Sequence, residues 1–187
     1  MFRPRLLLVL GVLLSLGLAG TAAEWSRFRG PNGTGTSDDK DIPVEWNAGN
    51  VRWKLAIPGL GHSSPVVWGK RLFLQTAAKD GSDRSLVCVD TDKGEIAWKK
   101  SIPAHTSSKH DRNSLASSTP ATDGERVYCF FWDAKNLLLY AYDFKGEVVW
   151  KRGDADDKDR GELGLYEVNN QGGQSQHGAG TSPVVYD

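Results

Sequence analysis

Short apolar runs separated by turns recur along most of the chain. One such run reads Gly-x-[Val/Ile]-x-Trp-Lys and occupies residues 49–54, 94–99 and 146–151. β-Branched and aromatic residues of this kind favour strands. No stretch after residue 23 keeps a helical period over three turns, so the hydrophobic pattern predicts an all-β fold.

Two further runs repeat in step with the first. One begins with Ser-Ser-Pro, Ser-Thr-Pro or Thr-Ser-Pro at 63–65, 118–120 and 181–183. The other reads Leu-x-[Cys/Ala]-x-Asp, at 86–90 and 139–143, and leads into the glycine turn of the tryptophan run. One unit therefore holds four short strands: the serine–proline strand, a second strand after a tight turn, the strand that ends in Asp, and the tryptophan strand.

Four-stranded units repeated at this spacing are typical of β-propeller blades. The strands are apolar on both faces, as at 72–74 and 137–139, which suits sheets covered front and back by neighbouring sheets. A solenoid is the structural alternative, but β-helical repeats are much shorter. We therefore predict a partial β-propeller of four-stranded antiparallel blades, with two complete blades and the start of a third.

The N-terminus has the three parts of a secretory signal peptide: basic Met1–Arg5, an apolar run at Leu6–Leu18, and small residues up to Ala23. The apolar run is too short to span a membrane, although a retained anchor is the alternative. We predict cleavage after Ala23 and export to the periplasm or the extracellular space. Thr21 stands where a lipoprotein would have cysteine, so we expect no lipid anchor and no membrane span.

The tryptophan run at Asn50–Ile57 is not preceded by a strand that ends in Asp. We predict that it forms a strand off the first blade, poorly paired or joined to the end at 181–187, as when both ends of a ring share one blade. We expect the chain to be the N-terminal fragment of a longer propeller, with lateral assembly of chains as the alternative. The predicted parts are a signal peptide at 1–23, an extended segment at 24–48 and an incomplete propeller at 49–187.

Composition adds limits on the function. The 187 residues carry 23 Lys and Arg against 23 Asp and Glu, so the net charge is zero. A nucleic-acid-binding domain would need a basic excess, and we expect no nucleic-acid partner. The 39% hydrophobic content excludes collagen-like and disordered classes, while 21 glycines and 7 tryptophans fit a turn-rich β protein.

The succession of a Ser-x-Pro strand, a Leu-x-[Cys/Ala]-x-Asp strand and a Gly-to-Trp strand resembles the quinoprotein-type (PQQ-like) propeller repeat. In that family the serine–proline strand is innermost, and the tryptophan of the outermost strand docks between adjacent blades. Residues 25–35 also look like the opening of exported bacterial members. The resemblance implies blade-docking roles for Asp90, Gly94, Trp98, Asp143, Gly146 and Trp150.

Histidines precede each predicted innermost strand. In a propeller these loops surround the mouth of the central channel, where His, Ser and Asn side chains can converge on a ligand. The candidate ligand-binding residues are His62, Ser63, His110, Asn113 and His177. The alternative is that these side chains only pack or solvate the loops. Their irregular spacing to the following prolines predicts no metal site.

Other motifs have ordinary explanations. An EF-hand register from Asp154 puts Lys158 at a ligand position and Leu165 where Glu belongs, so the sequence predicts a solvated loop there. Gly-His-Ser-Ser-Pro lacks the pattern of a nucleophile elbow, and we name no catalytic residue. Cys88 and Cys129 lie in apolar runs and are expected to be buried, with a disulfide left open.

These observations favour a non-catalytic exported propeller that acts as a protein- or ligand-binding scaffold, without a cofactor. Its partner is an unidentified protein or small molecule. The resemblance implies an alternative, the N-terminal part of a quinoprotein dehydrogenase that uses pyrroloquinoline quinone (PQQ) and calcium. Several such enzymes also have an adjacent Cys-Cys pair, which this sequence does not contain. Whether the protein is an enzyme stays open at this stage.

Overall fold

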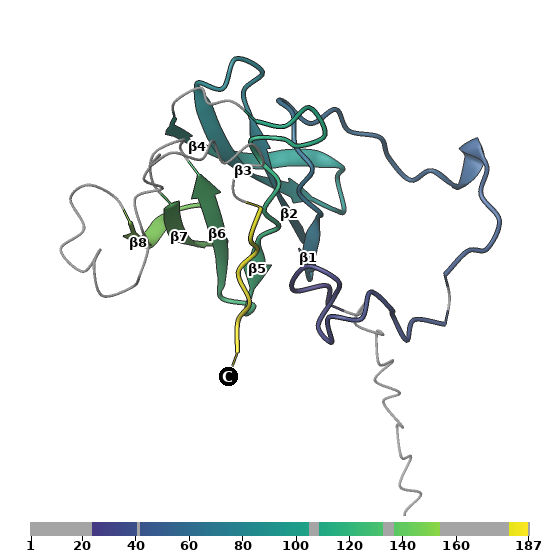
Figure 1. Ribbon diagram of the computed structural model, residues 1–187. Helices are drawn as coiled ribbons and strands as arrows, with labels where there is room; N and C mark the ends of the chain where they lie inside the picture. The colour runs from purple at the N-terminus through teal and green to yellow at the C-terminus, as the bar shows by residue number, and fades with distance from the viewer. Residues whose placement is uncertain (1–23, 41, 105–108, 133–136, 154–179, 187) are drawn as a thin grey trace, which may run out of the picture.

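A computed structural model of the chain describes residues 24–40, 42–104, 109–132, 137–153 and 180–186. Two four-stranded antiparallel sheets follow one another along this part of the chain (Figure 1). In each sheet every strand pairs with its neighbour in sequence, as in a propeller blade. The predicted all-β fold of four-stranded antiparallel blades is confirmed.

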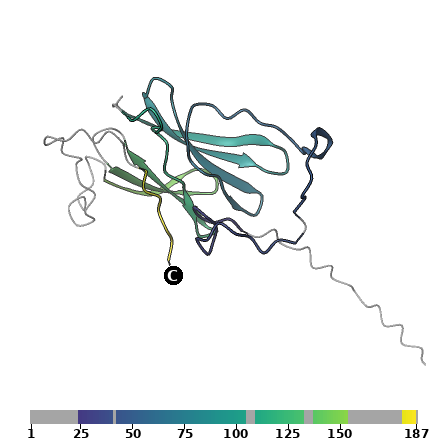
Figure 2. The same ribbon diagram turned by 45° about the vertical axis from the view of Figure 1, so that its right-hand side comes forward.

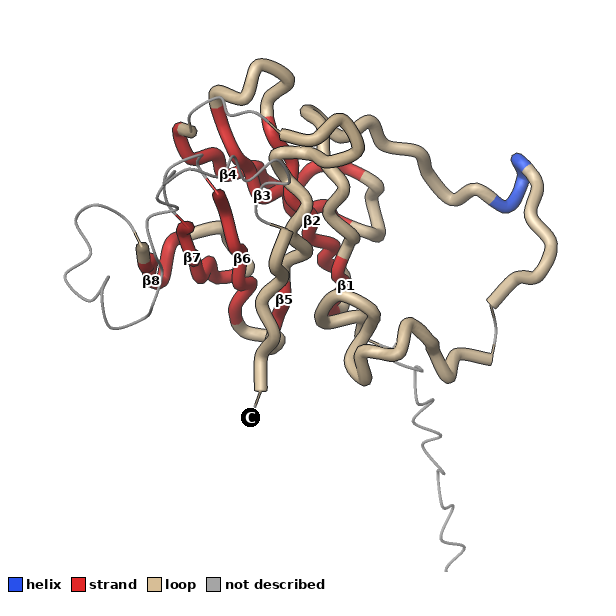
Figure 3. The backbone as a smooth tube through the Cα atoms, in the orientation of Figure 1, coloured by secondary structure: helices blue, strands red, loops and turns tan. Residues whose placement is uncertain are grey.

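The strands have the order expected from the repeats. The first sheet contains β1 (Val66–Trp68), β2 (Arg71–Ala77), β3 (Asp83–Asp90) and β4 (Glu95–Pro103). The second sheet contains β5 (Ala121–Thr122), β6 (Arg126–Trp132), β7 (Leu137–Asp143) and β8 (Val148–Arg152). The described residues contain no α-helix, and a short 3-10 helix, η1, covers Ala48–Asn50 (Figure 3). The strand register shifts between Cys88 and Val89 in the first sheet and between Ala141 and Tyr142 in the second. The two sheets therefore have the same irregularity at equivalent positions of the repeat.

The hydrophobic core lies where the two sheets face each other (Figure 2). The Phe73 ring of the first sheet lies 5.1 Å from the Phe144 ring and 5.9 Å from the Trp98 ring, measured between centroids. Both sheets supply the buried residues, which are Val66, Phe73, Leu86, Cys88, Ile102, Val127, Cys129, Phe131, Leu138, Tyr140 and Tyr142. Burial of these side chains is the main force that holds the blades together.

Both cysteines are free thiols inside this core. Burial raises the pKa of the Cys88 thiol to about 12 and that of Cys129 above its usual range. At pH 8 the Cys88 thiol is then ionised in only about one molecule in ten thousand, and burial disfavours the thiolate of Cys129 as well. We therefore expect a thiol-specific disulfide reagent to leave the native protein unlabelled and to label two thiols in guanidinium chloride. Fast labelling of the native protein would contradict the burial of these residues.

Residues 51–57 form no strand, so the prediction of a strand at Asn50–Ile57 is wrong. The physical reason is that a strand needs a paired edge, and no strand of the described residues runs beside this segment. The segment does lie outside the first sheet, whose fourth strand is β4. A side chain holds it there instead: the Trp53 indole Nε1 donates to the Thr91 carbonyl oxygen at 2.8 Å.

A third blade was predicted to begin at residues 180–186, but these residues contain no strand. They lie beside the segment that leads into β5 (Figure 1). Three predictions concern residues that the structure does not describe. They are the signal peptide at 1–23, the acidic loop that begins at Asp154, and the candidate ligand-binding residue His177. In the part of the chain that is described, no helix is long and apolar enough to cross a membrane.

Candidate functional site

The N-terminal segment lies across the inner edges of both blades. Trp25 and Val67 of β1 exchange two backbone hydrogen bonds, of 2.9 and 2.8 Å. The next residue, Ser26, accepts a hydrogen bond of 2.8 Å from the backbone N–H of Thr122 in β5. This segment therefore ties β1 to β5 at the edge that each sheet would otherwise leave unpaired.

Residues 25–26, which make these bonds, are called the N-terminal strap here. The tight turn that follows the strap contains two arginines, Arg27 and Arg29. The Arg27 guanidinium donates to the carbonyl oxygens of Gly30 at 3.3 Å and Pro31 at 2.8 Å. The backbone N–H of Gly35 closes the turn on the Arg29 carbonyl oxygen at 2.8 Å. Arg29 has φ 64, and no other non-glycine residue of the described part has a positive φ. The turn thus orients the Arg27 side chain and fixes the backbone of Arg29.

Two loops, residues 59–65 and 113–119, lead into the inner strands β1 and β5 and are called the mouth loops here. They are hydrogen-bonded to each other. The backbone N–H of His62 donates to the Ala116 carbonyl oxygen and to Ser114 Oγ, both at 3.0 Å. A Cβ at Gly61 would lie 2.8 Å from the Gln75 carbonyl oxygen, so the close approach of the loop requires glycine there.

The hydroxyl residue before each repeated proline links one blade to the next. The Ser64 backbone N–H donates to Thr119 Oγ1 at 3.1 Å, and the Thr119 N–H donates to Ser182 Oγ at 3.0 Å. The partners lie 55 and 63 residues apart. Ser or Thr is needed at this position because its oxygen must accept from a backbone N–H of the neighbouring blade.

Two clefts open between these segments, and His62 lines both of them. The larger cleft, of about 630 Å³, lies between the arginine turn and the mouth loops, and its walls include Arg27, Arg29, Ser117, Thr119 and Ser182. The smaller cleft, of about 210 Å³, lies between the mouth loops and the β2–β3 turn, and its walls include Lys79, Lys109 and Asn113.

The structure brings together two of the five candidate ligand-binding residues, His62 and Asn113, at the smaller cleft. Ser63 points inward, where its hydroxyl accepts from the Gln75 N–H at 3.0 Å. His110 lies in a neighbouring turn, where its Nδ1 accepts from the Arg112 N–H at 3.1 Å, and it lines neither cleft. The fifth, His177, is outside the described residues. Ligand binding by these residues stays a prediction.

Sequence reasoning missed the cations of the clefts. Arg27 and Arg29 belong to a segment without regular structure, and Lys79 belongs to a hairpin turn. Nothing in their local pattern indicates that they approach His62. One feature of the sequence could have pointed to these cations: the two closely spaced arginines of Trp-Ser-Arg-Phe-Arg-Gly, to which the repeats assign no role.

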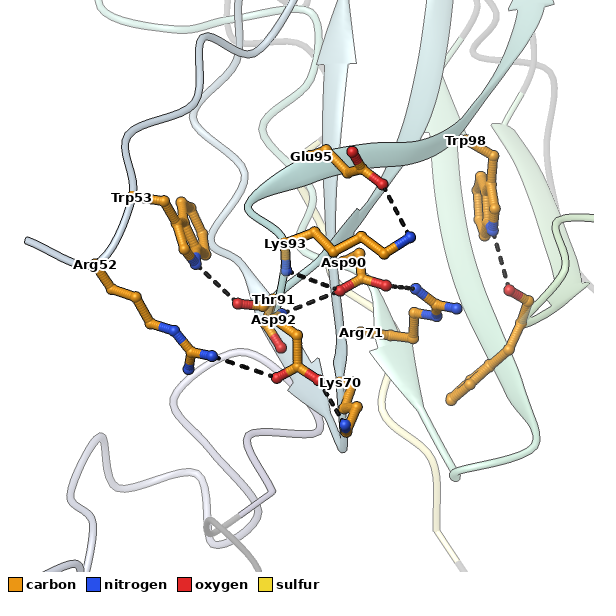
Figure 4. Close-up of polar contacts among 11 residues, drawn as sticks. Arg52, Trp53, Lys70, Arg71, Asp90, Thr91, Asp92, Lys93, Glu95 and Trp98 are labelled. Carbon is orange, nitrogen blue, oxygen red and sulfur yellow. Dashed lines mark hydrogen bonds and ion pairs between the residues drawn. The ribbon is translucent and has the colours of Figure 1, made fainter.

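Figure 4 shows two of the predicted blade-docking residues, Asp90 and Trp98, with their polar contacts. Asp90 accepts from the backbone N–H of Lys93 and from the Arg71 guanidinium, and these hydrogen bonds lower the pKa of its carboxyl. The Trp98 indole Nε1 donates to the Phe144 carbonyl oxygen of the second blade at 3.0 Å. Trp53 makes the same contact with the first blade, so the geometry repeats from blade to blade.

The second copy of this turn has the same chemistry. Asp143 accepts from the backbone N–H groups of Lys145 and Glu147, and Gly146 has φ 87 beneath the Trp98 ring. Trp150 lies 5.9 Å from Tyr128, between ring centroids. Docking roles for these residues remain a proposal that the contacts support.

A calcium ion bound by protein needs several oxygen ligands, many of them carboxylates. Among the residues that the structure describes, no group of three or more His, Cys, Asp or Glu side chains lies close enough to hold a metal ion. The described residues therefore do not supply a calcium site.

Comparisons with known proteins place the chain in a family. A family model described as outer membrane protein assembly factor BamB matches residues 34–170. No curated protein matches the chain. Solved structures with similarity include a europium-containing methanol dehydrogenase, at 16% identity and a TM-score of 0.34, over 48% of this chain and 15% of that one. A quinohemoprotein alcohol dehydrogenase from Pseudomonas putida HK5 is 22% identical, with a TM-score of 0.33, over 46% of this chain and 12% of that one.

The chain thus spans a small part of either dehydrogenase, and likenesses at these TM-scores carry no argument about activity. The family model, in contrast, covers most of the chain, including both described blades. With its repeated four-stranded sheets, the chain belongs to the PQQ-like repeat family whose model is described as outer membrane protein assembly factor BamB.

Proposed function

We propose that this chain is part of an exported, non-catalytic propeller that binds a small molecule or a protein through its mouth loops. The observation that carries this proposal is the pair of clefts that meet at His62. Recessed sites with a few convergent polar groups are where proteins bind ligands. The loops that form the clefts are held by backbone hydrogen bonds across the blades, so the site is preformed.

The engagement of the loop hydroxyls supports binding rather than covalent catalysis. Ser63 Oγ contacts the Gln75 N–H and the Ser64 carbonyl oxygen, and Thr119 Oγ1 accepts from the Ser64 N–H. A nucleophilic serine instead needs a base that takes its proton. These hydroxyls serve as structural links between backbone groups.

Export is part of the proposal, and the basic, apolar and small-residue segments of 1–23 support it. The alternative activity, that of a PQQ- and calcium-dependent dehydrogenase, needs metal ligands that the described residues do not supply. We therefore propose no calcium site among the described residues, and the proposed function uses no cofactor.

Nuclear magnetic resonance of the isotope-labelled protein tests the binding function. We expect at least one compound of a panel of carboxylates, phosphates, sugars and amines to shift the backbone amides of His62, Asn113 and Ser114. His62→Gln should weaken this binding about fivefold, since it removes a ring that lines both clefts. His110→Gln is the matched control and should leave it unchanged.

A panel in which every compound leaves the mouth-loop amides in place would contradict binding of small molecules at this site. Protein binding would then be read from a site-specific photo-crosslinker at Asn113. It should capture one protein that the same crosslinker at Lys145, on the outer turn, does not capture. Equal capture from both positions would overturn the proposal.

A further inference from the structure

We propose that the larger cleft binds an anionic group, a phosphate or a carboxylate, between the arginine turn and the mouth loops. The inference rests on the proposed function, because it names the ligand class of the same site. It also gives a ligand-binding role to the arginines of the Trp-Ser-Arg-Phe-Arg-Gly segment, which is not part of the blade repeats.

The charge of the cleft walls carries the inference. Arg27 and Arg29 line one wall, and His62 lies at another. The other polar residues among the described lining are Ser117, Thr119 and Ser182, and none of the described lining residues is a carboxylate. Guanidinium groups are donors that match phosphate and carboxylate oxygens. Thr119 and Ser182 accept from backbone N–H groups and can still donate an O–H, whereas Ser117 Oγ already donates to Asn113 Oδ1.

The neighbouring cleft extends the positive field. It adds Lys79 and Lys109 on the other side of His62, and its described lining residues likewise include no carboxylate. The chain as a whole has 23 basic and 23 acidic residues, so this concentration of cations is a local feature. Charges of one sign that line a recess attract ligands of the opposite sign and raise their local concentration.

Arg27 is held in position before any ligand arrives. It donates two hydrogen bonds to carbonyl oxygens of its own turn, which orients its guanidinium plane. A guanidinium oriented in this way loses less conformational entropy on binding than a mobile one. Arg29 has a left-handed backbone conformation that glycine or asparagine would adopt at less cost, and its side chain is exposed at the cleft.

Asp123, an acidic residue that shares a neighbouring cleft with Arg27, is already engaged. Asp123 borders a separate cleft on the far side of Arg27, where the Tyr128 hydroxyl donates to its carboxylate at 2.6 Å. The backbone N–H groups of Glu125 and Arg126 donate to the same carboxylate at 2.9 and 2.7 Å. The Asp123 charge is thus compensated within its own turn.

The test titrates the isotope-labelled protein with inorganic phosphate in one arm and with acetate in the other. We expect saturable shifts of the His62, Ser117 and Thr119 amides in at least one arm, and loss of these shifts at about 1 M NaCl, where charges are screened within about 3 Å. The stronger arm identifies the anionic group. Linear shifts without saturation in both arms would overturn the proposal.

Arg29→Asn is the decisive variant, because asparagine removes the charge and tolerates the positive φ. It should weaken anion binding about fivefold. Arg52→Asn is the matched control, because Arg52 is an exposed arginine on the outer side, 3.6 Å from Asp92, and it should change the affinity less than about twofold. Equal weakening by both variants would show a nonspecific charge effect and overturn the proposal.

Failure of the inference is distinguishable from failure of the proposed function. If neutral sugars shift the mouth-loop amides while phosphate and acetate do not, the ligand is not anionic but the binding function stands. If no compound shifts these amides, the inference of an anionic ligand is wrong, and so is the proposal that the mouth loops bind small molecules. Arg29→Gly is a second charge-free variant in case Arg29→Asn does not fold.

Discussion

Replacement of Arg84 by alanine is expected to lower the free energy of unfolding by about 4 kcal/mol, the largest effect that we expect from one substitution. Arg84 is fully buried between the two blades. Its Nε donates to the Trp132 carbonyl oxygen of the second blade at 2.9 Å, and its Nη1 donates to the carbonyl oxygens of Gly81 and Asp83 at 3.0 Å. Alanine would leave these acceptors without their donor and a cavity in place of the side chain.

Urea unfolding followed by tryptophan fluorescence measures this effect. Arg84→Met fills most of the cavity and removes the buried charge, so it should cost less, about 2 kcal/mol. Arg112→Met, at an exposed position, is the control and should change stability by less than about 0.5 kcal/mol. An Arg84→Ala protein as stable as the original would refute the assignment of Arg84 as a link between the blades.

The second large effect is expected at Trp98, whose replacement by alanine should cost about 3 kcal/mol. The Trp98 ring lies 5.9 Å from Phe73 and 6.4 Å from Tyr142, between centroids, and its Nε1 bonds to the Phe144 carbonyl oxygen. Alanine removes the aromatic contacts and the hydrogen bond together.

Two further variants separate these contributions. Trp98→Phe keeps an aromatic ring but loses the hydrogen bond, and should cost about 1 kcal/mol. Trp46→Ala is the matched control, because Trp46 is 70% exposed and should contribute little. If Trp98→Ala and Trp46→Ala lowered the midpoint of thermal unfolding equally, the docking role proposed for Trp98 would be wrong.

The elements that sequence reasoning predicted correctly are those with a local pattern. The strands of both blades follow from apolar runs bounded by Asp-Gly, Trp-Gly and Lys-Gly turns. The segment at Asn50–Ile57 shows the limit of this approach. Its sequence matches that of β4, yet it is not a strand, because pairing depends on a neighbour that the local pattern does not contain.

Polar contacts between blades were harder to predict. The role of Thr119 depends on Ser64 and Ser182, which lie 55 and 63 residues away. Arg84 is a charged residue in an apolar strand, and the carbonyl groups that accept its hydrogen bonds help to explain its burial. The arginines of the larger cleft reach His62 because the N-terminal segment pairs with β1, a contact that no periodicity announces.

By itself, the sequence determined the strand order and the four-stranded unit, because hydrophobic alternation and repeated turn residues are properties of short segments. The family followed from the resemblance of the repeated runs to a known repeat, and the family model confirms it. Only the tertiary structure decided which polar side chains meet. Hydrogen bonds and charge–charge contacts act over a few ångströms, and the residues that make them here come from the N-terminal strap, two mouth loops and the chain end. Stacking of the blades brings those segments together, and with them the cleft to which we assign an anionic ligand.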